Sequence, residues 1–197
     1  MKAVIPLAGK GTRLRPHTHH TPKPLMKVAG KPVLAYILDD LLALGVSEVV
    51  FIVGYLRETA EAWIASEYPN LTAHYVLQEV QDGTAGAIAL SEPFVDEDVL
   101  IIFADAVLEV DYGLTATRGQ ENDALIWAME VEDYQRYGVI VTNDDGSMKS
   151  LLNRGSDWSS PEKQFTSIIW PILWVLFISG QHRPTTEEGR SFKIPVP

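Results

Sequence analysis

The chain has 197 residues, of which 46% are hydrophobic, and this is enough for one domain with a sizeable core. Its net charge of −10 argues against broad nucleic-acid binding, and it has no cysteine for disulfides or thiolate chemistry. No signal-peptide pattern follows Met1 and no apolar run is long enough to cross a bilayer, so we expect a cytoplasmic protein without a membrane partner.

Apolar runs and helical periodicity alternate along the first hundred residues. We predict strands at 3–7, 48–53, 72–78 and 99–103, and helices at 33–44, 57–67 and 83–90. Gly45 ends the first helix and Pro69 breaks the second. Because strands alternate with helices, the pattern predicts an α/β fold with a Rossmann-like, mostly parallel (mixed) sheet flanked by helices. Further strands are predicted at 123–131, 137–141 and 148–152, with a hairpin turn at 143–146.

The loop after the first strand carries an anion-binding pattern. Gly9 and Gly11 let the backbone curl, so that several N–H groups can converge on one point. Arg13 follows at once, and Lys23 stands between two prolines. A backbone nest with an arginine and a stiffly held lysine suits a polyphosphate. An ordinary glycine turn would explain the glycines but not Arg13 and the Pro-Lys-Pro segment.

A dinucleotide-binding loop is a rival interpretation of the same glycines. That loop needs Gly-x-Gly-x-x-Gly running directly into a helix. Here Leu14 stands at the third glycine position, and Pro16 blocks a helix soon after it. The second strand also ends at Gly54 rather than at an acidic residue. We therefore disfavour an NAD-dependent enzyme.

Residues 3–27 resemble the sugar-nucleotide pyrophosphorylases, the nucleotidyltransferases that join a nucleoside triphosphate to a sugar 1-phosphate. Their signature is Gly-x-Gly-Thr-Arg-Leu-x-Pro, then Thr, then Pro-Lys-Pro-Leu, and it stands here at residues 9–16, Thr18 and 22–25. Lys10 replaces a glycine that the family often has. The resemblance implies a fold of the nucleotide-diphospho-sugar transferase type and these two substrates. Which sugar and which base are used stays open.

The resemblance also implies roles for individual residues. Arg13 would neutralise charge on the leaving pyrophosphate, and Lys23 would bind phosphate oxygens at the reacting centre. Asp105, after the fourth strand, would hold Mg²⁺, although Ala104 replaces the usual glycine before it. The backbone of Gly138 would contact the sugar. The nucleotide would be bound by Leu7, Ala8, Gly9, Lys10, Gly11, Thr12, Gln78, Gly83 and Thr84.

The base-reading position has two candidates in the sequence. The family has a glutamine after its third strand, and an amide offers both a donor and an acceptor to a base edge. The spacing to Gly83 favours Gln78 over Gln81, without removing the second.

The resemblance covers residues 1–152 and then stops. The family would next show Glu-Lys-Pro and later a second metal-binding aspartate, but residues 152–157 read Leu-Asn-Arg-Gly-Ser-Asp. We therefore expect a nucleotidyltransferase domain at 1–152 and an atypical tail at 153–197. A shifted reading frame, or a truncated and diverged gene, is our hypothesis for that tail. The alternative is a non-catalytic relative that binds a nucleotide or sugar nucleotide, or an inactive truncated gene product. Whether the chain forms a homo-oligomer also stays open.

Overall fold

The computed structural model describes residues 1–105, 124–127, 139–145, 147–152, 175–178 and 192–193. The chain divides into two compact units, Met1–Tyr112 and Gly113–Pro197. Every residue to which the resemblance assigns a role belongs to the described part of the first unit, with the exception of Gly138, which lies outside the described residues.

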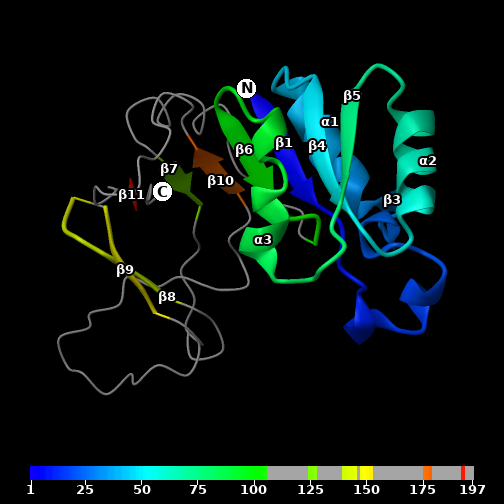
Figure 1. Cartoon of the computed structure of the whole chain (residues 1–197), viewed down its shortest axis with the longest axis horizontal. Helices are drawn as coiled ribbons and strands as arrows, with labels where there is room; N and C mark the ends of the chain where they lie inside the picture. The colour runs from blue at the N-terminus through cyan, green and yellow to red at the C-terminus, as the bar shows by residue number, and fades with distance from the viewer. Residues whose placement is uncertain (106–123, 128–138, 146, 153–174, 179–191, 194–197) are drawn as a thin grey trace. The chain divides into compact units, whose positions relative to one another are not determined.

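Four parallel strands form the sheet of the first unit. Their order is β6-β1-β4-β5, and Figure 1 shows them side by side. Every pairing between neighbours is parallel. The strands are β1 (Lys2–Pro6), β4 (Glu48–Val53), β5 (Thr72–Leu77) and β6 (Val99–Ile102). The prediction of a mostly parallel α/β sheet is therefore confirmed.

Three α-helices connect these strands. They are α1 (Val33–Ala43), α2 (Arg57–Glu67) and α3 (Thr84–Ala89), each within one residue of its predicted bounds. Gly45 has φ +86°, a left-handed conformation that suits a glycine just after a helix end. Four single-turn 3₁₀ helices were not predicted: η1 (Thr12–Leu14), η2 (His17–His19), η3 (Lys23–Leu25) and η4 (Glu92–Phe94). Within the described ranges, no helix is long and apolar enough to cross a membrane.

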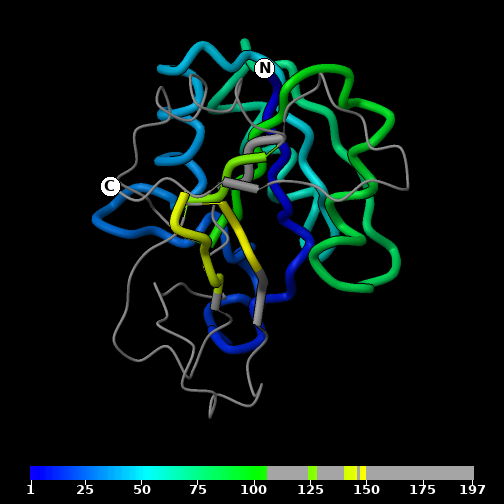
Figure 2. The backbone as a smooth tube through the Cα atoms, turned by 90° about the vertical axis from the view of Figure 1, so that its left-hand side faces the viewer, coloured from blue at the N-terminus to red at the C-terminus, as the bar shows by residue number. Residues whose placement is uncertain are grey.

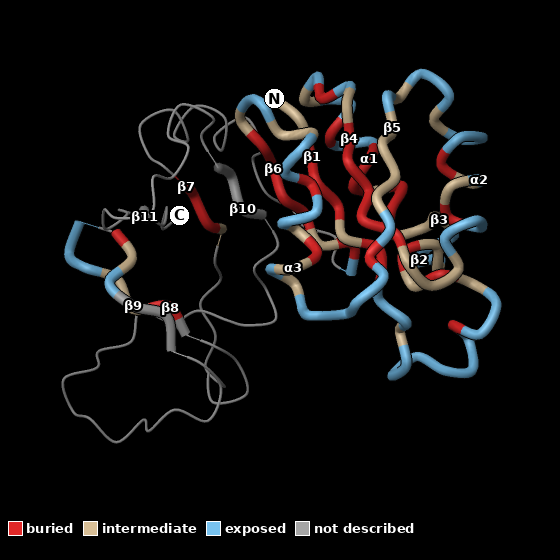
Figure 3. The backbone as a smooth tube through the Cα atoms, viewed as in Figure 1, coloured by how far each residue is buried: buried red, intermediate tan, exposed pale blue. Residues whose placement is uncertain are grey.

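The core of the first unit runs along β1, β4 and β6, which are almost entirely buried (Figure 3). These strands are near-continuous runs of Val, Ile, Leu and Ala, as expected for strands with helices on both faces. The strand β5 pairs only with β4 among the described strands and is half-exposed. The sheet thus gives a rigid base to the loops at its carboxyl end.

A charged network joins the amino ends of β1 and β4. The Nζ of Lys2 lies 2.9 Å from Glu48 Oε1 and 2.8 Å from Asp96 Oδ1. Glu48 also bonds to His74 on β5, with 3.0 Å between Oε1 and Nε2. The hydrogen bond from Lys2, supported by that to His74, holds the pKa of the Glu48 carboxyl below its usual value despite the opposing effect of burial. This network lies at the end of the sheet away from the glycine loop.

A short hairpin at residues 27–32 was also not predicted. Its strands are β2 (Lys27–Val28) and β3 (Lys31–Pro32), paired antiparallel. Ala29 and Gly30 form the turn with φ +50° and +86°. Two-residue hairpin turns with positive φ favour Asn-Gly or Asp-Gly, so an alanine at the first position gives no local signal. The hairpin belongs to the segment between β1 and α1, drawn in blue in Figure 2, which leaves the sheet where β1 ends.

The described residues of the second unit include two groups of strands. The strand β7 (Ala124–Ile126) pairs antiparallel with β10 (Val175–Ile178) and parallel with β11 (Phe192–Lys193). The strands β8 (Val139–Thr142) and β9 (Met148–Leu152) form the predicted hairpin, in which Asn143 donates its backbone N–H to the Ser147 carbonyl at 2.9 Å. The antiparallel pairs confirm the mixed character predicted for the fold. Gly146 and the rest of the predicted strand 123–131 beyond Trp127 lie outside the described residues.

Candidate functional site

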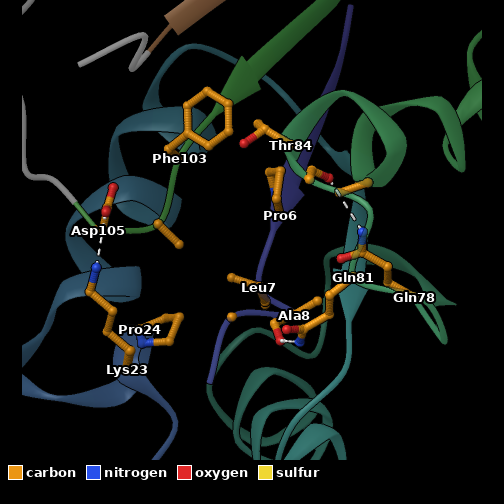
Figure 4. Close-up of a pocket in the computed structure, with 14 residues that line it drawn as sticks. Pro6, Leu7, Ala8, Lys23, Pro24, Gln78, Gln81, Thr84, Phe103 and Asp105 are labelled. Carbon is orange, nitrogen blue, oxygen red and sulfur yellow. Dashed lines mark hydrogen bonds and ion pairs between the residues drawn. The ribbon is translucent and has the colours of Figure 1, made fainter. Parts of the chain in front are cut away.

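A pocket of about 390 Å³ opens where β1, β5 and β6 end (Figure 4). Because all strands of a parallel sheet point the same way, the segments that follow them meet at one edge, which is where ligands of open α/β sheets bind. The residues that line it are Pro6, Leu7, Ala8, Gly9, Lys23, Pro24, Gln78, Gln81, Gly83, Thr84, Ala87, Phe103, Ala104 and Asp105.

Most of the residues singled out from the sequence meet at this pocket. Those that line it are Leu7, Ala8, Gly9, Lys23, Gln78, Gly83, Thr84 and Asp105. Lys10, Gly11, Thr12 and Arg13 stand in the same loop but not in the lining, and Gly138 lies outside the described residues. The fold therefore brings together four separate segments of the sequence, at residues 7–9, 23, 78–84 and 105.

Lys23 and Asp105 form an ion pair at one side of the pocket. The Nζ of Lys23 donates to Asp105 Oδ2 at 2.9 Å, across 82 residues of sequence. Both side chains keep access to solvent, with exposures of 35% and 43%. Figure 4 shows the two facing each other, with Gln78, Gln81 and Thr84 across the pocket. The pair places a cation and a carboxylate beside one cavity, where either can turn to a ligand of opposite charge.

Thr18 holds the glycine loop in shape. Gly11 has φ +59°, and a Cβ added there would lie 2.9 Å from Thr18 Cγ2 and 3.3 Å from Lys23 Cβ. The Thr18 hydroxyl donates to the Gly11 carbonyl at 2.9 Å, and its residue is only 1% exposed. Only glycine fits this left-handed, crowded position without strain. The sequence showed Thr18 as part of a signature without saying what it does.

Thr18→Val is expected to lower the free energy of unfolding by about 1 kcal/mol, because it removes one hydrogen bond from a partly buried carbonyl and keeps the shape of the side chain. Gly11 keeps its second donor, the N–H of Leu14 at 2.9 Å, so the loss is moderate. Urea denaturation followed by circular dichroism measures the change. A Thr18→Val variant as stable as the wild type would mean that the hydrogen bond is not what holds the loop.

The end of β4 packs against the start of the same loop. A Cβ at Gly54 would lie 2.9 Å from Ala8 Cβ and 3.1 Å from its Cα and carbonyl oxygen. Leu7 donates its backbone N–H to the Ile52 carbonyl at 2.7 Å. The absence of a side chain at Gly54 thus lets the start of the loop lie directly on β4.

The segment after β5 forms the opposite wall of the pocket. Gln78 is 8% exposed, and its Nε2 donates to Asp82 Oδ1 at 3.1 Å and to the Gly83 carbonyl at 3.4 Å. Gln81 donates its Nε2 to the Ala8 carbonyl at 3.1 Å and so ties this segment to the glycine loop. Gly83 has φ +102° and ψ −176°, a region open to glycine alone. The sequence did not reveal the hydrogen bond between Gln78 and Asp82, because no spacing rule links Asp82 to the Gln78 amide.

Asp105 is the carboxylate best placed to hold a cation at the pocket. No group of three or more histidine, aspartate or glutamate side chains that could bind a metal occurs among the described residues. A cation held by Asp105 would need further oxygen ligands, such as water or phosphate oxygens. This arrangement suits Mg²⁺, which is commonly held by one or two carboxylates plus substrate phosphates.

Comparison with known proteins identifies relatives that are nucleotidyltransferases. The family model described as Nucleotidyl transferase matches residues 2–154. A UTP–glucose-1-phosphate uridylyltransferase of Haloferax volcanii is 35% identical over 78% of this chain and 65% of its own length. A mannose-1-phosphate guanylyltransferase catalytic subunit beta of Drosophila pseudoobscura is 29% identical over 81% of this chain and 45% of its own length. The chain thus spans less than two thirds of these relatives.

Solved structures show the same fold. UDP-glucose pyrophosphorylase complexed with UDP-glucose has a TM-score of 0.76 at 20% identity, covering 91% of this chain and 76% of the other. HddC from Yersinia pseudotuberculosis complexed with GMP-PN has a TM-score of 0.75 at 24% identity, covering 100% and 90%. The family model matches well over half of the residues, and it includes the glycine loop, the Lys23–Asp105 pair and the Gln78 segment. The chain therefore belongs to the nucleotidyl transferase family.

Proposed function

We propose that the chain is a sugar-phosphate nucleotidyltransferase, which joins a nucleoside triphosphate to a sugar 1-phosphate and releases pyrophosphate. The observation that carries this proposal is the pocket itself. It sets Lys23 and Asp105, a cation and a carboxylate suited to phosphates and their metal, across from Gln78, an amide suited to a base. Uridine triphosphate and glucose 1-phosphate are the first substrates to test, because the 35%-identical relative is named for them.

The reaction needs positioning and charge neutralisation rather than a covalent nucleophile. An oxygen of the sugar phosphate attacks the α-phosphorus, the new P–O bond forms, and the bond to the pyrophosphate breaks in line. The attacking phosphate is already anionic, so no general base is required. Lys23 binds oxygens at the reacting phosphorus, and Arg13 neutralises charge on the leaving pyrophosphate. Magnesium held by Asp105 supplies further charge neutralisation when it is bound.

The binding segments have separate tasks in this proposal. Leu7, Ala8 and Gly9 form the floor under the nucleotide, and Gly83 and Thr84 offer backbone groups beside Gln78. Lys10, Gly11, Thr12 and Arg13 lie beyond the lining, so they reach a triphosphate only where it extends along the loop. The sugar contact that the resemblance implies for Gly138 falls outside the described residues.

Arg13→Ala is expected to lower pyrophosphate release by about 10³-fold, the size typical of removing a charge clamp from phosphoryl transfer. The assay uses the full chain with Mg²⁺, a panel of triphosphates and a panel of sugar 1-phosphates. Arg15→Ala, two residues away in the same basic segment, is the matched control and is expected to keep most of the activity. Release that does not require a sugar phosphate would contradict the proposed reaction.

A second outcome of that assay points to the alternative function. A chain that releases no pyrophosphate yet binds a triphosphate in an Arg13-dependent manner would be a nucleotide-binding relative without turnover. The observation that favours this alternative is the sequence after Leu152, which reads Asn-Arg-Gly-Ser-Asp where the family would show Glu-Lys-Pro. Equilibrium binding of the same triphosphates, measured beside the assay, separates the two functions.

A further inference from the structure

We propose that Asp82 locks the side-chain amide of Gln78 as a hydrogen-bond acceptor toward the pocket, so that the site selects bases with a ring N–H, namely uracil, thymine or guanine, over cytosine and adenine. This inference rests on the proposed function, because it concerns how the same pocket reads the base of a nucleoside triphosphate. Asp82 is in this proposal a positioning residue, which acts through Gln78 and does not touch the base.

The partners of the Gln78 amide determine its orientation. Its Nε2 donates to Asp82 Oδ1 at 3.1 Å and to the Gly83 carbonyl oxygen at 3.4 Å. A carboxylate and a carbonyl are both acceptors, so turning the amide over would set Oε1 against two other oxygens. Figure 4 shows the bonded nitrogen of Gln78 at the dashed line. Both amide hydrogens are thus used, and Oε1 is the polar atom that is left for a ligand.

The Asp82 carboxylate is itself held against α3. A Cβ added at Gly86 would lie 2.1 Å from Asp82 Oδ1 and 2.3 Å from its Cγ. The carboxylate therefore rests in the space that the missing side chain of Gly86 leaves. The other acceptor is also fixed, because the Gly83 carbonyl accepts the backbone N–H of Ala87 at 3.1 Å. Two independent contacts with the first turn of α3 thus keep the amide in one orientation.

The acceptor that remains has chemical consequences for the base. Gln78 lines the pocket and is 8% exposed, and no group among the described residues donates to its Oε1. The ring nitrogen at the centre of the pairing edge carries a hydrogen in uracil, thymine and guanine and a lone pair in cytosine and adenine. Against a fixed oxygen the first group donates, whereas the second sets two acceptors face to face. A site built to bond an N–H rejects analogues that lack it.

Isothermal titration of the full chain with triphosphates and Mg²⁺, without sugar phosphate, tests this inference. We expect UTP, dTTP or GTP to bind at least about tenfold more tightly than CTP, ATP and N3-methyluridine triphosphate, from which the ring N–H has been removed. The order of affinity among UTP, dTTP and GTP does not bear on the inference.

The test compares the dissociation constants of CTP and ATP with those of UTP, dTTP and GTP. Two variants are expected to reduce this affinity ratio to about threefold or less. In Asp82→Asn the new amide can donate or accept, so Gln78 can turn over and meet either kind of base. In Gly86→Ala the methyl group displaces the Asp82 carboxylate, while alanine is the better helix former, so the fold is retained. Glu79→Gln is the matched control: it removes the same charge from the same exposed loop but has no bond to Gln78, and it should keep the wild-type ratio.

The outcomes separate the inference from the function on which it rests. Wild-type protein that binds CTP or ATP as tightly as UTP overturns the inference and leaves the enzyme proposal standing. Asp82→Asn and Gly86→Ala variants that both keep the wild-type ratio overturn the role of Asp82. A wild-type chain that binds no triphosphate at all counts against the proposed function, and the inference falls with it.

Discussion

Lys23→Met is expected to lower pyrophosphate release by about 10²–10³-fold, because it removes the ammonium group that pairs with Asp105 at the pocket. Methionine keeps most of the length of the lysine stem, so the packing of η3 is preserved. Lys23 is paired with Asp105, and under the proposed function a triphosphate would draw the ammonium toward its own oxygens. Such an exchange would leave the Asp105 carboxylate available to a cation.

Lys27→Met is the matched control for this variant. Lys27 is an exposed lysine four residues further along, in the β2–β3 hairpin and outside this pocket. It is expected to leave the rate within about twofold of the wild type, since a solvated surface charge adds little. Steady-state kinetics at saturating triphosphate would show the difference. Equal losses in the two variants would mean that net charge, rather than the Lys23–Asp105 position, is what matters.

Phe51→Ala is expected to cost about 3–5 kcal/mol of the free energy of unfolding, the range found when a buried phenylalanine is cut to alanine. Phe51 lies on β4 with no exposed surface, and its ring stacks on Tyr75 of β5 with centroids 5.6 Å apart. The register pairs these two residues directly across the strands. Loss of the ring therefore leaves a cavity beside the sheet and removes the ring contact with Tyr75 on β5.

Urea denaturation measures this loss, with Leu42→Ala as the control. Leu42 is on α1 and 42% exposed, so its truncation removes less buried surface than that of the fully buried Phe51, and it places a strong helix former in a helix. Its effect should stay within about 0.5 kcal/mol, as for most surface substitutions. A Phe51→Ala variant about as stable as this control would mean that the core of the first unit does not depend on β4.

Element bounds in the first unit were accessible from the sequence because local signals agreed with each other. The strand Glu48–Val53 and the helix Arg57–Glu67 were both predicted at their observed bounds. A continuous apolar run, helical spacing and a following breaker all point the same way there. The hairpin at 27–32 had no such agreement. Its turn needs positive φ at Ala29, which local propensity disfavours, so only its place between η3 and α1 accounts for it.

The sequence by itself determined the family, the order of strands and helices, and the set of charged and amide residues from which a site could be built. It did so because those properties depend on residue type and spacing along the chain. Only the tertiary structure decided which of them meet. Lys23 reaches Asp105 across 82 residues and Gln81 reaches Ala8 across 73, since parallel strands end at one edge. The orientation of the Gln78 amide likewise depends on Asp82 and on the space above Gly86, and this three-dimensional contact has no signature in spacing.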